Sequence, residues 1–120
     1  MLTQNTLTIL QYNVRKSKDT VMATLLRDPD IGRYDILAIQ EPWKNPFDTT
    51  THHPAKDQFH LCYPDKDQTL PARVCFFINK RLDHSRWHFE EANRDLGSLN
   101  LRLGTEEEQP IMVHNVYNPI

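Results

Sequence analysis

Two short apolar segments flank a helical pattern within the first forty residues, and this arrangement limits the folds open to the chain. Residues 7–13 (LTILQYN) and 34–40 (YDILAIQ) are rich in β-branched and large apolar side chains, as strands are. Between them, Ser17 is a candidate N-cap, and apolar residues recur at helical spacing up to the residues just before Pro29. A strand–helix–strand unit predicts two roughly parallel strands in one sheet. The consecutive apolar residues ILAI also predict a strand covered on both faces.

A different pattern follows this unit. Residues 42–57 carry three prolines and many turn formers, which predicts a long surface loop. Five β-like segments come next, at residues 59–63, 73–79, 86–89, 96–103 and 111–117. The acidic run at 106–108 is typical of a solvated hairpin tip. One early helix followed mainly by strands predicts the α/β class, in the form of half of a layered sandwich.

Composition excludes several classes of protein. The 120 residues allow one domain at most, and the net charge of -2 gives no overall basic field for nucleic acid. Cys62 and Cys75 are too few for a disulfide scaffold, so we expect reduced thiols that are mostly buried. No apolar run approaches the roughly 20 residues of a membrane span, so no membrane partner is expected.

Polar residues close the first two predicted strands. Asn13 ends the first strand, and Glu41 follows the buried run of the second. Parallel neighbours would bring both side chains to one carboxyl edge of the sheet, where α/β folds place their ligands. A carboxylate and an amide oxygen suit a hard cation such as Mg²⁺. The same positions also suit a turn-forming Asn and a loop-capping Glu, so the spacing leaves both interpretations open.

Basic residues lie near the same edge. Arg15, Lys16 and Lys18 follow the first predicted strand, either as contacts for a phosphate backbone or as a solvated helix start. Arg73 opens the strongly apolar segment VCFFI. It is a candidate phosphate ligand at this edge, and equally a structural arginine at a strand end.

Four sequence blocks, in order, carry a likeness to a known family. They are ILQYNVRKS, DILAIQEPW, ARVCFFIN and VHNVYNP. This series resembles the endonuclease/exonuclease/phosphatase superfamily, and within it the endonuclease domain of LINE-type (non-LTR) retrotransposons. The resemblance implies a four-layer α/β sandwich, the DNase I-like fold. It covers nearly all of this chain but about the N-terminal half of the family's domain, so residues 1–120 are expected to form a truncated domain.

The resemblance also implies roles for individual residues. Glu41 matches the family's metal-binding carboxylate, and Asn13 matches the Asn that supports the metal site. Tyr117 matches the Tyr whose hydroxyl contacts the scissile phosphate, with Gln40 as a neighbour that holds the site. The implied activity is a DNA endonuclease that uses Mg²⁺, with Mn²⁺ as a substitute. A retrotransposon product of this kind would act in the nucleus, and any other product would be intracellular.

The chain also departs from the family pattern. In the family, a DxN pair, a later Asp and a C-terminal SDH follow the strand that ends in a Tyr-x-Pro motif, which is Tyr117-Asn118-Pro119 here. This chain lacks those downstream motifs. We therefore expect the chain alone to be a weak or inactive nuclease. Two alternatives stay open: a non-catalytic remnant of a truncated element, and a phosphatase-like protein acting on a small phosphorylated molecule. A half sandwich would also leave an apolar sheet face uncovered, which predicts self-association through that face.

Overall fold

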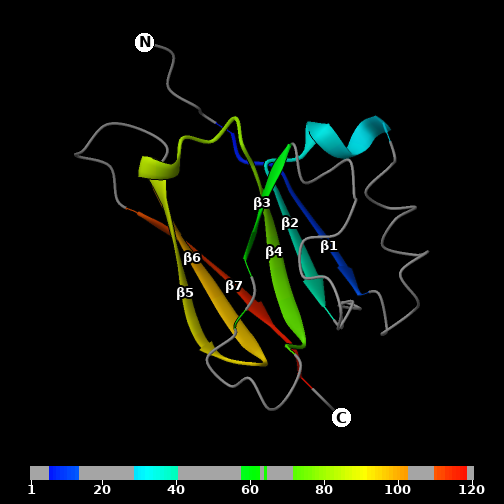
Figure 1. Cartoon of the computed structure of the whole chain (residues 1–120), viewed down its shortest axis with the longest axis vertical. Helices are drawn as coiled ribbons and strands as arrows, with labels where there is room; N and C mark the ends of the chain where they lie inside the picture. Colours follow the sequence, from blue (N-terminus) through cyan, green and yellow to red (C-terminus); the bar gives the residue numbers. More distant parts are fainter. Residues whose placement is uncertain are drawn as a thin grey trace.

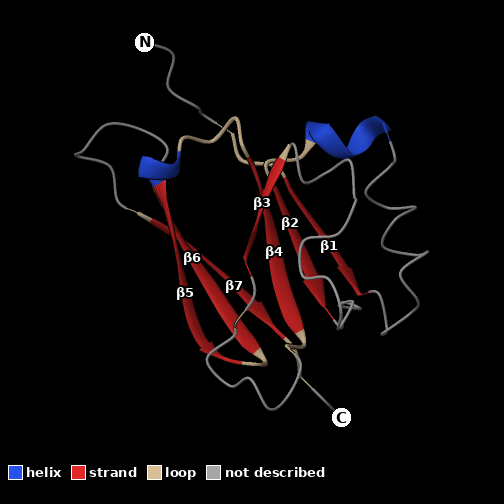
Figure 2. Ribbon diagram, in the orientation of Figure 1, coloured by secondary structure: helices blue, strands red, loops and turns tan. Residues whose placement is uncertain are grey.

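Strands in two sheets make up most of the structure that can be described. The computed structural model describes residues 6–13, 29–40, 58–62, 64, 72–102 and 110–118. These ranges form seven strands and two short 3₁₀ helices, with no α-helix among them (Figures 1 and 2). No helix in the described ranges is long and apolar enough to cross a membrane.

The first sheet has the strand order β1-β2-β4-β3. Its strands are β1 (Ile9–Asn13), β2 (Ile36–Gln40), β4 (Val74–Asn79) and β3 (Phe59–Cys62). β1 and β2 are parallel neighbours, which confirms the pairing predicted from the strand–helix–strand pattern. β4 runs antiparallel to both β2 and β3. The 3₁₀ helix η1 (Pro29–Arg33) precedes β2.

The second sheet is an antiparallel meander of order β5-β6-β7. Its strands are β5 (Trp87–Asn93), β6 (Leu96–Leu101) and β7 (Ile111–Val116), and the 3₁₀ helix η3 (His84–Arg86) precedes β5. Gly97 on β6 allows a close approach, because a Cβ atom there would lie 3.0 Å from a ring carbon of Phe89. The ring of Phe89 therefore lies close to Gly97, and it meets Phe76 of the first sheet edge to face, with ring centroids 6.1 Å apart.

The main core lies between the two sheets, which are packed face to face in Figure 1. β2 and β4 each direct alternate residues toward the second sheet, as the two-residue period of a strand requires. The buried side chains of this core are Ile36, Ala38, Phe76, Ile78, Leu82, Trp87, Leu99 and Leu101. Full burial of a side chain as large as that of Phe76 contributes about 1.5–3 kcal/mol to folding. Trp87, at the start of β5, belongs to this core and is 8% exposed.

The opposite face of the first sheet is also buried. The intervening residues of β2 and β4 form a second cluster with residues from η1 and β3; its members are Ile31, Leu37, Ile39, Phe59, Cys75 and Phe77. Burial on both faces of β2 confirms the prediction made from the ILAI run. Cys62 and Cys75 form no disulfide, as predicted from their number and spacing.

The later strands occur where they are predicted, but their ends differ. The segment predicted at 86–89 extends to Asn93, because Glu90, Glu91 and Asn93 pair with β6 although they break the apolar pattern. The C-terminal end of β5 is set by backbone pairing with β6, and the periodicity of apolar residues does not reveal such pairing. The predicted helix before Pro29, the loop at 42–57 and the hairpin tip at 106–108 lie outside the described residues. The two-sheet, strand-rich arrangement is present, and the specific DNase I-like sandwich stays a prediction.

A buried carboxylate closes one end of the first sheet. Asp35, directly before β2, is 3% exposed, and its Oδ2 accepts hydrogen bonds from the backbone N–H (2.9 Å) and hydroxyl (3.1 Å) of Thr8. Its Oδ1 accepts from Nε of Arg81 at 2.9 Å. Burial alone raises the pKa of Asp35, but the hydrogen bonds from Thr8 and Arg81 and the charge of Arg81 outweigh it and lower the pKa below its ordinary 3.8. This network joins the start of β1, the start of β2 and the turn after β4.

Candidate functional site

Three strand ends of the first sheet meet at one edge. Asn13 ends β1 and Gln40 ends β2, and these two residues are aligned partners in the parallel pair. Val74, the first residue of β4, pairs with Gln40, so Arg73 lies directly before β4 at the same place. We call this edge, where β1 and β2 end and β4 begins, the site edge. It holds three of the residues singled out from the sequence: Asn13, Gln40 and Arg73.

β7 of the second sheet brings Tyr117 to the site edge. The side-chain nitrogen of Gln40 donates a hydrogen bond of 3.4 Å to the carbonyl oxygen of Val116, the last residue of β7. Tyr117 follows immediately and is half-buried. In Figure 1 the ends of β1, β2 and β7 lie together in the lower part of the view. Residues predicted from separate parts of the chain are thus close in space.

A buried amide holds β7 against the central strands of the first sheet. Asn115 is 2% exposed, and its Nδ2 donates hydrogen bonds to the carbonyl oxygens of Ile39 (3.0 Å) and Cys75 (2.9 Å). Its Oδ1 accepts a hydrogen bond of 3.1 Å from Nε2 of Gln40. Sequence reasoning gave Asn115 no role. The available signal was a short polar side chain inside the apolar strand segment MVHNVY, at a position that turns out to face the core.

A second set of contacts surrounds Tyr117. Arg73 forms a two-fold salt bridge with Asp95, with Nε–Oδ1 and Nη2–Oδ2 distances of 2.5 and 2.7 Å. The guanidinium carbon of Arg73 lies 4.7 Å from the centre of the Tyr117 ring. The backbone N–H of Tyr117 donates to the carbonyl oxygen of Asp95 at 2.8 Å. Asp95 lies in the turn between β5 and β6, and no pattern in the sequence pointed to it.

The remaining predicted residues lie outside the described ranges. These are Glu41, which follows Gln40 directly in the sequence, and the basic residues Arg15, Lys16 and Lys18. Asn13 is exposed at the end of β1, and its amide oxygen is the kind of ligand that a hard divalent cation accepts. Among the described residues, no three or more His, Cys, Asp or Glu side chains are grouped so as to hold a metal ion.

A cavity of mixed polar and apolar lining lies between the sheets beside the site edge. It has a volume of about 260 Å³, and residues of β1, β2 and β7 line it: Ile9, Gln11, Ala38, Gln40, Val113, His114, Asn115 and Val116. His114 Nδ1 lies 2.7 Å from the hydroxyl oxygen of Ser98 on β6, at hydrogen-bonding distance. This contact gives the imidazole of His114 a partner within the second sheet.

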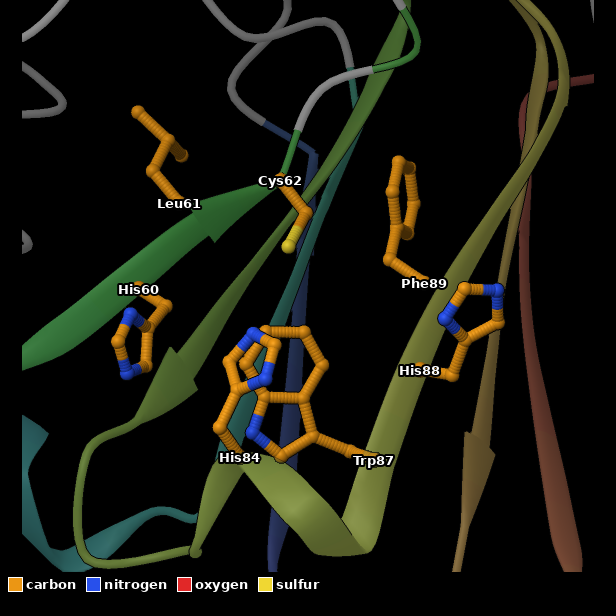
Figure 3. A pocket seen from close by; sticks show the side chains of 7 residues that line it. All are labelled: His60, Leu61, Cys62, His84, Trp87, His88 and Phe89. Carbon is orange, nitrogen blue, oxygen red and sulfur yellow. The ribbon is translucent and has the colours of Figure 1, made fainter.

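A larger cavity, of about 350 Å³, lies at the other side of the sandwich, between β3 and β5 (Figure 3). His84 packs on Trp87 with ring centroids 4.1 Å apart, and His60 lies 5.5 Å from Trp87. Burial lowers the pKa of His60, with further lowering from the charges of Lys80 and His84. Burial also raises the pKa of the Cys62 thiol to about 11, so this thiol is protonated at neutral pH. The Cys62 thiol is therefore not an activated nucleophile.

Comparisons with known proteins add no assignment. No protein-family model matches the chain, and no match is found among the curated proteins or the solved structures.

Proposed function

We propose that the chain is the N-terminal part of a Mg²⁺-dependent phosphodiesterase, a DNA endonuclease of the endonuclease/exonuclease/phosphatase type. The observation that carries this proposal is the convergence of Asn13, Gln40 and Tyr117 at the site edge, from β1, β2 and the segment after β7. The resemblance assigns a function to these same positions, which come from three segments far apart in the chain. Their convergence is what a phosphodiesterase site needs.

Each residue would have a distinct role at the site. Glu41, next along the chain from Gln40, would supply the carboxylate for the cation, and the Asn13 amide would support it. The cation, when bound, stabilises negative charge that develops on the phosphate oxygens. Tyr117 would donate its hydroxyl hydrogen bond to a phosphate oxygen and so orient the phosphodiester. The salt bridge with Asp95 leaves Arg73 a weaker candidate for direct phosphate contact than an unpaired arginine would be.

DNA is the substrate that the local charge favours. Arg15 and Lys16 come two and three residues after Asn13, the last residue of β1. They would contact the phosphate backbone of a bound DNA strand. Because the net charge of the chain is only -2, binding would depend on this local patch. Each phosphate contact releases condensed counterions, so affinity should fall as salt is raised.

Nicking of supercoiled plasmid tests the proposal. The wild type, Glu41→Ala and Tyr117→Phe are compared with Mg²⁺, with Mn²⁺ and with EDTA, and Glu90→Ala, an exposed carboxylate change on β5, serves as the matched control. We expect slow nicking that requires the metal, that Glu41→Ala abolishes and that Glu90→Ala leaves intact. Nicking that Glu41→Ala does not change would reject the metal assignment.

The rival functions give other results in the same assay. A wild type that neither nicks nor binds DNA in the presence of Mg²⁺ would identify a non-catalytic remnant. Metal-dependent release of phosphate from p-nitrophenyl phosphate, without plasmid nicking, would identify a phosphatase-like protein instead.

A further inference from the structure

We infer that Asp95 is a positioning residue of the site: through Arg73, it holds the ring of Tyr117 in the orientation used to contact phosphate. The role assigned to Tyr117 in this inference rests on the proposed function. The geometry itself rests on three contacts that join the start of β4, the β5–β6 turn and the end of β7.

The three contacts form a closed circuit. The carboxylate of Asp95 pairs with Nε and Nη2 of Arg73, which fixes the plane of the guanidinium group. That group lies over the ring of Tyr117, 4.7 Å from its centre. The backbone carbonyl oxygen of Asp95 accepts from the N–H of Tyr117 at 2.8 Å, which closes the circuit. Asp95 therefore anchors both the main chain and, through Arg73, the aromatic ring of Tyr117.

Partial burial makes these contacts effective. The side chains of Arg73 and Asp95 are only 21% and 30% exposed, so water screens their attraction less than at an open surface. The backbone N–H of Arg73 also donates to the carbonyl oxygen of Arg94 at 2.7 Å, which holds the start of β4 against the turn. Lysine could not replace this arginine, because it has neither the planar face nor the paired donors.

Positioning is a separate function from binding phosphate directly. Arg73 pairs with the carboxylate of Asp95 through Nε and Nη2, and its guanidinium group lies over the ring of Tyr117, so its charge and its orientation are engaged within the protein. The hydroxyl of Tyr117 is then the group that meets the phosphate, and Arg73 and Asp95 act through it. Misplacement of such a group by about 1 Å can slow a reaction by up to about a hundred-fold.

A spectroscopic experiment tests the circuit without any assay of activity. In proton–nitrogen NMR spectra of the whole chain, the Nε–H of Arg73 should exchange slowly with water, and its side-chain protons should be shifted by the Tyr117 ring current. Asp95→Asn should remove the slow exchange, and Tyr117→Leu should remove the ring-current shift. Asp30→Asn, which alters the exposed Asp30–Arg33 pair, should leave both signals unchanged. A wild type without either signal would overturn the inference.

A double-mutant cycle tests the positioning role. Single-turnover nicking is measured for the wild type, Asp95→Asn, Tyr117→Phe and the double variant, together with thermal unfolding to check that each is folded. Asp95→Asn should slow nicking by about ten-fold in the wild type but not further in Tyr117→Phe, because both changes disable the same hydroxyl. Arg73→Lys should behave like Asp95→Asn.

The outcomes separate the two proposals. Losses that multiply in the double variant would show that Asp95 acts on the fold as a whole, which overturns the inference while the proposed function stands. A wild type that neither nicks nor binds DNA in the presence of Mg²⁺ would reject the proposed function and the positioning role together. The NMR result would then decide whether the circuit exists as a structural feature alone.

Discussion

Nε2 of Gln40 donates a hydrogen bond of 3.1 Å to Oδ1 of Asn115, which joins the last residue of β2 to the core-facing amide of β7. The two residues are 75 positions apart in the sequence. Because Asn115 also donates to two carbonyl oxygens of the first sheet, one side chain satisfies polar groups on β2 and β4 at once. This contact sets where β7 lies, and therefore where Tyr117 lies.

Asn115→Leu should destabilise the protein by about 2–4 kcal/mol, because it leaves the carbonyl oxygens of Ile39 and Cys75 buried without these partners. Urea unfolding followed by fluorescence gives the change in the free energy of unfolding. Met112→Leu, at an exposed position of the same strand, is the control and should change stability by less than about 0.5 kcal/mol. Equal stability of Asn115→Leu and the wild type would contradict a structural role for this amide.

Asp35→Asn should destabilise the protein at neutral pH by about 2–3 kcal/mol, through loss of charge-assisted hydrogen bonds to Thr8 and Arg81. Folding lowers the pKa of Asp35, so its contribution is fully present above the ordinary value of 3.8 and is lost as the pH falls through the folded value. The difference between wild type and variant should therefore shrink once the pH falls below 3.8. Urea unfolding across this pH range measures it.

The exposed pair Asp30–Arg33 provides the control for that experiment. Its side chains are 71% and 79% exposed, so Asp30→Asn should change stability by less than about 0.5 kcal/mol at any pH. An Asp35→Asn variant with the same pH dependence as the wild type would mean that other carboxyl groups govern acid unfolding.

Cys62 should react slowly with iodoacetamide at neutral pH, because burial raises its thiol pKa to about 11 and the thiolate is the reactive form. The rate should rise about ten-fold per pH unit up to about pH 10. Mass spectrometry after timed alkylation follows each cysteine separately. Cys75, which is fully buried, should react only after unfolding, and rapid labelling of Cys75 in the native protein would contradict the core described above.

The outer strands β1 and β7 should promote self-association. Among the described strands, β1 pairs only with β2 and β7 only with β6, and both expose apolar side chains, Ile9 at 40% and Val116 at 52%. Exposed strand edges of this kind are templates for pairing with another chain. In the double variant Ile9→Lys/Val116→Lys, the added charges should oppose pairing between chains. Sedimentation velocity at high protein concentration should therefore show more monomer for this variant than for the wild type.

Leu61→Lys is the matched change for that experiment. Leu61 is exposed to a similar degree, but it lies on β3, at the other edge of the first sheet. We expect it to leave self-association unchanged. If it acts as strongly as the double change, association proceeds through the β3 side, and a wild type that stays monomeric throughout would refute the prediction altogether.

The sequence by itself determined the strands and the direction of the first pair. β-branched and apolar runs such as ILAI and VCFFI mark buried strands because side-chain character repeats locally along the backbone. The strand–helix–strand order then implied parallel pairing, which brings Asn13 beside Gln40. Glu41, the residue on which the metal assignment depends, lies outside the described residues, so its role stays a prediction.

The tertiary structure alone decided how the two sheets meet. The period of a strand reports which residues share a face, but not which strand of another sheet lies opposite. The roles of Asn115 and Asp95 follow from that packing, since Asn115 spans two strands of the other sheet and Asp95 acts from a turn on Arg73 and Tyr117. Such contacts depend on side-chain geometry between distant segments, and local sequence patterns carry no record of it.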